Sequence, residues 1–97
     1  MIRSVFPVLS VEDIDTCRDF YRDVLEMELT FECGWYTSLA VPGDVTNQVA
    51  FVLAGHPSVP DGYGLPAAGC LVTVDVDDVD EVHRRTLELG HTPVLDI

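Results

Sequence analysis

A short acidic pattern occurs twice in this chain, and the two copies lie 65 residues apart. Residues 11–15 read VEDID, and residues 76–80 read VDDVD. Each copy follows a run of β-forming residues and precedes a stretch in which apolar residues recur at helical spacing. This shared position at a strand-to-helix junction favours duplication of one structural unit over a chance match, so the fold has to accommodate two copies of that unit.

The first copy belongs to a unit with one helix and several strands. Residues 5–11 are rich in β-forming residues and predict a strand. From Asp13 to Leu25 the apolar residues have the spacing of one face of an amphipathic helix, and Ser10 and Asp13 supply its N-terminal cap. Three further strands are predicted over residues 29–33, 35–41 and 48–53. The predicted order of the unit is therefore βαβββ.

The second copy follows a flexible connection. Residues 56–69 are rich in glycine and proline and predict a linker. Residues 70–76 then predict a strand, residues 78–89 predict a helix that ends at Gly90, and residues 91–97 begin another strand.

Together these patterns predict an α+β fold of paired βαβββ modules within a single domain that spans residues 1–97. Module one covers residues 1–55, the linker covers 56–69, and a partial module two covers 70–97. We expect the second module to be truncated at residue 97, because the last two strands of its copy have no counterpart in the sequence.

The charge of the chain restricts its partners. Seventeen acidic and five basic residues give a formal charge of −12, which disfavours nucleic acid and anionic membrane surfaces. No apolar run reaches the roughly 18 residues of a membrane helix, so we expect no membrane association and a cytoplasmic location. Cys17, Cys33 and Cys70 are widely spaced within apolar patterns, which is typical of a reducing compartment.

Several short stretches together resemble one known superfamily. They are residues 8–13, 20–21, 24–25, 76–79 and 89–90. In these stretches the chain resembles the vicinal-oxygen-chelate superfamily, which includes glyoxalase I, extradiol dioxygenases and the bleomycin and fosfomycin resistance proteins. The resemblance implies a curved, incomplete barrel that cups a ligand, with the helices on its outer face.

Glu26 departs from the pattern of that superfamily, in which glycine commonly ends the first helix. A non-glycine residue held at positive φ costs about 1 kcal/mol. We therefore expect the first helix to end in a different conformation here.

The resemblance also implies where a metal would bind, and the chain lacks suitable side chains there. Metalloenzymes of the superfamily carry His, Gln or Glu on the first strand of each module and Glu on the last strand. By the resemblance, the first position falls on Phe6, its repeat counterpart on Leu71, and the strand-four position on or near Val52. These side chains are hydrocarbon, so we expect neither a bound metal nor another cofactor, and we assign no catalytic residue.

If the helices lie outside the barrel, the bulky residues of each strand face the helices and the alternate residues face the ligand. This rule directs Phe31 and Trp35 toward the helices, while His56, in the linker, is expected at the surface. Tyr36 and Gln48 are the strongest candidates for ligand contact, because they offer a ring, a hydroxyl and an amide. The full set of predicted ligand-binding residues is Phe6, Glu32, Tyr36, Ser38, Gln48, Val52, Leu71 and Thr73.

Two functions of different classes fit these features. The apolar metal positions and the acidic charge favour a protein that binds and sequesters a small aromatic or cationic molecule without a metal. The alternative is an enzyme of the superfamily, a lyase, isomerase or dioxygenase relative, whose key residues lie in the missing C-terminal segment. We also expect a homodimer, since a module and a half buries too little apolar surface to offset its chain entropy.

Overall fold

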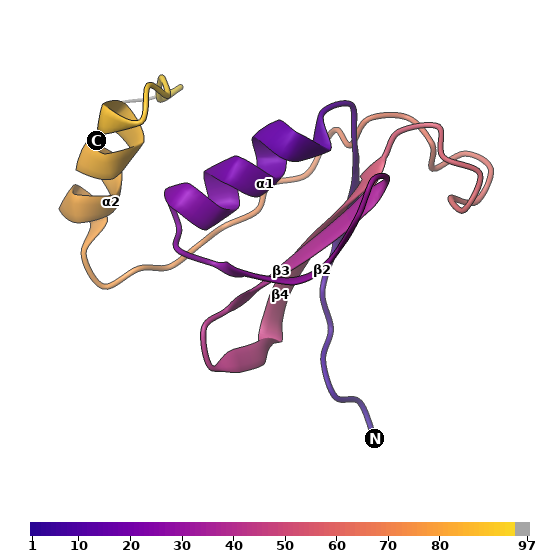
Figure 1. The fold of residues 1–97 in the computed structure, drawn as a ribbon, viewed down its shortest axis with the longest axis horizontal. Helices are drawn as coiled ribbons and strands as arrows, with labels where there is room; N and C mark the ends of the chain where they lie inside the picture. Colours follow the sequence, from indigo (N-terminus) through magenta and orange to yellow (C-terminus); the bar gives the residue numbers. More distant parts are fainter. Residues whose placement is uncertain (95–97) are drawn as a thin grey trace.

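A computed structural model describes residues 1–94 and is built on one four-stranded mixed sheet (Figure 1). The strands, in their order across the sheet, are β1 (Val8–Val11), β4 (Asp44–Leu53), β3 (Tyr36–Val41) and β2 (Glu28–Cys33). The helices are α1 (Ile14–Asp23) and α2 (Val79–Glu88). β1 is parallel to β4, the other neighbouring strands are antiparallel, and the described sheet does not close into a barrel. The α+β class and the βαβββ order of the first module are confirmed.

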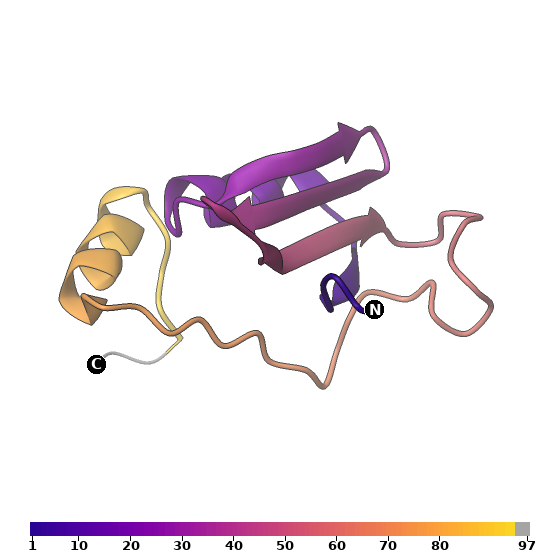
Figure 2. The same ribbon diagram turned by 90° about the horizontal axis from the view of Figure 1, so that it is seen from below.

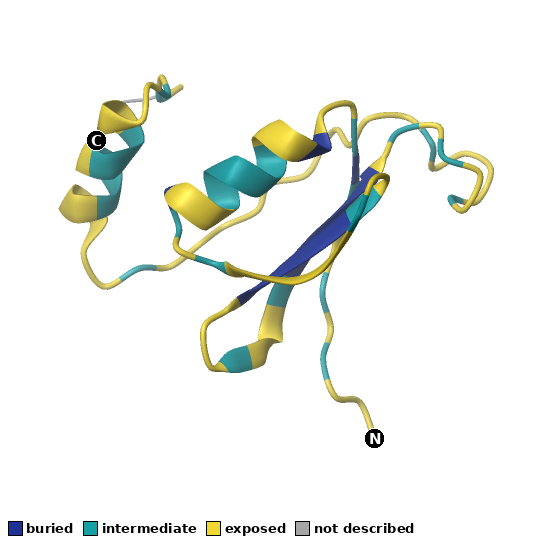
Figure 3. Ribbon diagram, in the orientation of Figure 1, coloured by how far each residue is buried: buried dark blue, intermediate teal, exposed yellow. Residues whose placement is uncertain are grey.

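Helix α1 lies across one face of the sheet and forms the core with it (Figures 1 and 3). Ile14 of α1 packs in one cluster with Leu39 of β3 and with Val49 and Phe51 of β4. The ring of Tyr21, also on α1, lies 5.1 Å from the ring of Phe51. Alternation directs these strand residues toward the helix, so the predicted facing of β3 and β4 is confirmed at these positions.

The duplicated sequence pattern forms the same cap at both helices. The Asp13 carboxylate accepts a hydrogen bond from the Thr16 N–H at 3.1 Å, and the Asp78 carboxylate accepts one from the Glu81 N–H at 3.0 Å. The cap residues share their backbone conformation, with φ of −128° and −130°. Each carboxylate satisfies an N–H that the helix itself leaves unpaired. The sequence repeat is therefore also a repeat of the helix start. Neither helix of the described chain has the length and apolarity needed to cross a membrane.

The prediction of a strand over residues 70–76 is wrong. This segment is extended and runs beside the sheet (Figure 2), but it pairs with no strand in the described part of the chain. The Ala67 N–H donates to the Ser10 carbonyl at 2.7 Å, but a cavity of about 400 Å³ then separates residues 70–73 from Leu9. A strand needs a neighbour within hydrogen-bonding distance, which sequence propensity does not provide. Residues 91–94 form no strand either, and the rest of the strand predicted over 91–97 lies outside the described residues.

Helix α2 contacts the end of α1. The ring of His91, which follows α2, is edge-on to the ring of Phe20, with centroids 5.1 Å apart. Arg85 of α2 forms an ion pair with Glu26. Within the described chain no residue of α2 is buried, and Val79 is 53% exposed. The apolar face of α2 is therefore covered less completely than that of α1.

The end of α1 adopts the conformation that glycine usually provides. Glu26 has a φ of 58°, and the Met27 N–H donates to the Tyr21 carbonyl at 3.1 Å. The expectation that a glutamate would give the helix a different end is wrong. Gly90, with a φ of 87°, has the corresponding left-handed conformation after α2. Thus both helices end in a left-handed residue, and at Glu26 that residue carries the steric cost of a Cβ.

We expect Glu26→Gly to raise the free energy of unfolding by about 1 kcal/mol, because glycine adopts positive φ without steric cost. The Arg85 ion pair is lost, but the Glu26 side chain is 73% exposed, and exposed ion pairs contribute little. Urea denaturation followed by circular dichroism measures the change. Glu26→Ala is the matched control: it removes the same ion pair, keeps the Cβ, and should not stabilise the protein. Equal loss of stability in both variants would contradict strain at this position.

Candidate functional site

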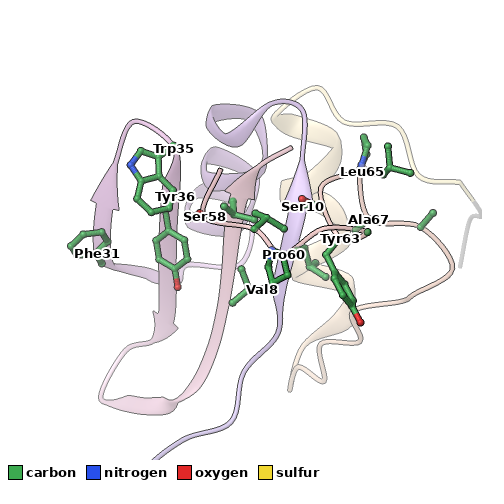
Figure 4. Close-up of a pocket in the computed structure, with 16 residues that line it drawn as sticks. Val8, Ser10, Phe31, Trp35, Tyr36, Ser58, Pro60, Tyr63, Leu65 and Ala67 are labelled. Carbon is green, nitrogen blue, oxygen red and sulfur yellow. The ribbon is translucent and has the colours of Figure 1, made fainter. Parts of the chain in front are cut away.

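A cavity of about 920 Å³ lies on the face of the sheet opposite to α1 (Figure 4). Ser10 of β1 is opposite Val52 of β4, and Val52 is opposite Tyr36 of β3. These three residues therefore share one face of the sheet, and all three line the cavity. Most residues of the loop 58–68 form the other wall. The segment predicted as a linker thus folds back to β1 and forms one wall of an open site.

Aromatic side chains gather at one side of this cavity (Figure 4). The ring of Tyr36 lies 5.9 Å from that of Phe31 and 6.0 Å from that of Trp35. The imidazole of His56 stacks on Trp35, with centroids 4.0 Å apart and planes inclined by 8°. His56 Nδ1 accepts a hydrogen bond from the Ser58 N–H at 3.1 Å. The stacked pair therefore also fixes the start of the loop 58–68.

A β-bulge in β2 explains why Phe31 faces the cavity. The pairing register of β2 with β3 shifts between Leu29 and Phe31, so that Phe31 is opposite Ser38. Thr30, at the bulge, places its hydroxyl 2.7 Å from the hydroxyl of Ser38. An extra residue in one strand reverses the facing of every residue that follows it. The prediction that Phe31 faces the helices is therefore wrong.

The same bulge moves Glu32 to the other face. Glu32 is opposite Thr37, which is itself opposite the core residue Phe51. Its carboxylate accepts a hydrogen bond from Arg18 Nη1 of α1 at 2.8 Å. The predicted cavity facing of Glu32 is wrong, and this carboxylate is engaged by the helix.

The structure brings some of the predicted ligand-binding residues together and separates others. Tyr36 and Val52 line the cavity, and Ser38 lies on the same face with its hydroxyl paired to Thr30. Gln48 shares this face but lies toward the opposite end of β4, where its amide donates to the Val45 carbonyl. The predicted face of the sheet is therefore correct for Gln48, but its position along β4 places it away from the cavity.

Three other predicted residues also lie away from the cavity wall. Phe6 precedes β1 and is half-buried, while Leu71 is 94% exposed on the unpaired segment. Thr73 follows on that segment and borders smaller cavities next to β4. Because residues 70–76 do not join the sheet, Leu71 and Thr73 do not reach the face that Tyr36 occupies.

Most residues of the cavity wall, among them Trp35 and Ser10, were not among the predicted ligand-binding residues. Trp35 was expected to face the helices, but it precedes β3 in a turn and lines the cavity instead. Ser10 was assigned to the helix cap, yet its side chain lies at the cavity wall. The alternation of β1 already places Ser10 on the side opposite to Leu9 and Val11, which pack against the core, so a signal for Ser10 was present.

The side chains at the positions implied for a metal do not fit one. Val52 presents a hydrocarbon side chain to the cavity, and Phe6 and Leu71 also lack a donor atom. Within residues 1–94, no group of three or more His, Cys, Asp or Glu side chains is arranged to hold a metal ion.

The sequence profile of the Glyoxalase/Bleomycin resistance protein/Dioxygenase superfamily matches residues 3–95. The chain belongs to this superfamily. No curated protein matches the chain in sequence.

Two solved structures are similar to this member of the superfamily in fold. One is lactoylglutathione lyase from Agrobacterium tumefaciens, with a TM-score of 0.60 and 20% identity over 93% of this chain and 72% of that one. The other is a bleomycin resistance determinant encoded on the transposon Tn5, with a TM-score of 0.61 and 20% identity over 99% of this chain and 72% of that one. At this identity, the likeness establishes the shared fold.

We expect His56→Ala to shift the fluorescence emission of Trp35 to longer wavelength, because the stacked imidazole no longer shields the indole from water. Trp35 is the single tryptophan of the chain, so the emission reports on this position. Quenching by acrylamide should increase in the same variant. His91→Ala is the matched control, since His91 packs on Phe20 and should leave the emission unchanged. Identical spectra for His56→Ala and wild type would contradict the stacked arrangement.

Proposed function

We propose that this protein binds a small aromatic molecule in the cavity opposite to α1 and sequesters it without a metal ion. The observation that carries this proposal is the aromatic wall formed by Phe31, Trp35 and Tyr36. Aromatic walls favour flat apolar ligands, because ring contacts add to the free energy of burying apolar surface. A volume of about 920 Å³ also falls within the range of small-molecule sites.

The polar groups at the cavity support binding rather than catalysis. The hydroxyl of Ser38 is paired with Thr30, and His56 uses Nδ1 to hold the loop. One hydroxyl at the cavity, Ser58 Oγ, lies 2.8 Å from His56 Nδ1, and the Ser58 N–H donates to the same nitrogen. These contacts join residues two apart in the chain, so they form a local turn that holds the loop. One similar structure is named a bleomycin resistance determinant and the other a lyase, so this fold is found both in a resistance protein and in an enzyme.

We expect the neutral dye Nile red to bind with one-to-one stoichiometry and with an increase in its emission, because the cavity is apolar. Tyr36→Ala should weaken this binding about tenfold through loss of ring contact, with little effect on stability since Tyr36 lies outside the α1 core. Gln48→Ala is the control, because Gln48 lies away from the cavity and should bind the dye as the wild type does. Absence of saturable dye binding, or equal binding by both variants, would defeat the proposed site.

We further expect protein purified without an affinity tag to contain no stoichiometric divalent metal. The residues at the implied positions, Phe6, Val52 and Leu71, offer no lone pair to a cation. Elemental analysis by mass spectrometry measures this directly. One equivalent of zinc, nickel, manganese or iron per chain would instead favour the alternative of a superfamily enzyme.

A further inference from the structure

The cavity has an uncharged lining in a strongly charged protein. Charged residues make up 23% of the chain, yet none of the described residues that line this cavity is Asp, Glu, Lys, Arg or His. A charged group that packs against this wall would lose part of its hydration without gaining a partner of opposite charge. The lining therefore disfavours ligands that carry a charge on the group in contact with the cavity wall.

One polar atom at the wall has no partner. Ser10 is 7% exposed, and its Oγ makes no hydrogen bond within the described chain. Ser10 shares the face of Val52 and Tyr36, and Figure 4 shows its hydroxyl on the cavity side of β1. An unpaired buried hydroxyl is unfavourable. A ligand that forms a hydrogen bond with it removes this cost, and the gain adds to the free energy of binding.

The loop 58–68 lies next to Ser10 at the cavity. It contains no helix or strand, and its end is tied to β1 where the Ala67 N–H donates to the Ser10 carbonyl at 2.7 Å. Ser10 Oγ itself has almost no accessible surface, so a ligand reaches it only when the neighbouring side chains move. Because the Ala67 bond uses the backbone of Ser10, the side-chain hydroxyl stays available to the ligand.

We propose that the ligand of this cavity is an uncharged aromatic molecule with one hydrogen-bonding group, and that this group pairs with Ser10 Oγ while the ring packs against Trp35 and Tyr36. The inference rests on the binding function proposed above and adds the class of ligand and the residue that selects it. A serine hydroxyl both donates and accepts, so a phenol-like hydroxyl on the ligand suits it.

Four probes of similar size test the inference. They are 4-methylphenol, toluene, 4-methylbenzoate and 4-methylbenzylammonium, which share one ring and differ in hydrogen bonding and charge. Dissociation constants and binding positions come from titrations of the isotope-labelled protein followed by backbone amide shifts in NMR spectra. We expect 4-methylphenol to bind most tightly, with shifts centred on residues 8–10, 35–36 and 58–68.

Ser10→Ala and Ser38→Ala form a matched pair of variants. Both remove a buried hydroxyl from the same face of the sheet, but the Ser38 hydroxyl already has Thr30 as its partner. Ser10→Ala should weaken 4-methylphenol about tenfold, leave toluene unchanged, and maintain or raise the melting temperature. Ser38→Ala should lower the melting temperature and leave all four affinities unchanged. This crossed pattern distinguishes ligand contact from a purely structural role.

The outcomes separate the two proposals. If 4-methylphenol and toluene bind equally, or Ser10→Ala binds 4-methylphenol as the wild type does, the role of Ser10 is overturned while the binding site stands. Tightest binding of 4-methylbenzylammonium or 4-methylbenzoate overturns the uncharged class of ligand and also leaves the site standing. If no probe shifts the cavity residues, both the inference and the proposed function fail.

Discussion

The packing of α1 against one face of the sheet determines the rest of the structure. Ile14 joins Leu39, Val49 and Phe51 in one buried cluster, and burial of these side chains is the main apolar contribution to the core. A strand that turns its bulky residues toward one side must turn the alternate residues toward the other. On β1 the alternate residues are Val8 and the small Ser10, and both line the cavity. The cavity is thus a consequence of how the core is packed.

A single irregularity modifies this arrangement where the ligand wall is built. Without the bulge in β2, Phe31 would lie under α1 and Glu32 would face the cavity. With it, the ring of Phe31 joins Tyr36, and the carboxylate of Glu32 joins Arg18. One extra residue therefore places the ring of Phe31 at the cavity wall in place of the carboxylate of Glu32. A carboxylate at this apolar wall would lack a cation, which is unfavourable.

Much of the fold could be predicted from the sequence because its signals are local. The repeated caps at Asp13 and Asp78, the helical spacing after them and the alternation in β4 all depend on neighbouring residues, and each has the predicted structural consequence. The site could be predicted only in part, since Tyr36 and Val52 follow from alternation. The bulge depends on the partner strand, and the return of the loop 58–68 over β1 depends on tertiary contacts, so neither is readable from local pattern.

The unpaired segment 70–76 illustrates the same limit. Its β-forming residues have the composition of a strand, but such propensity expresses how well side chains fit a pleated and partly buried surface. In the structure no strand lies within hydrogen-bonding distance of this segment. A cavity of about 400 Å³ lies between residues 70–73 and Leu9 of β1. The duplicated sequence therefore gives two equal helix starts but two unequal strands before them.

The charged side chains of the two helices do not line the cavity. Both helices carry acidic side chains paired with arginines, as in Arg22 with Asp23 and Arg84 with Glu81. The hydrogen bonds from these arginines lower the pKa values of Asp23 and Glu81. Such surface charges are screened within about 8 Å at physiological salt. The net charge of −12 therefore has little effect on an uncharged ligand, and contacts with the uncharged wall decide what stays bound.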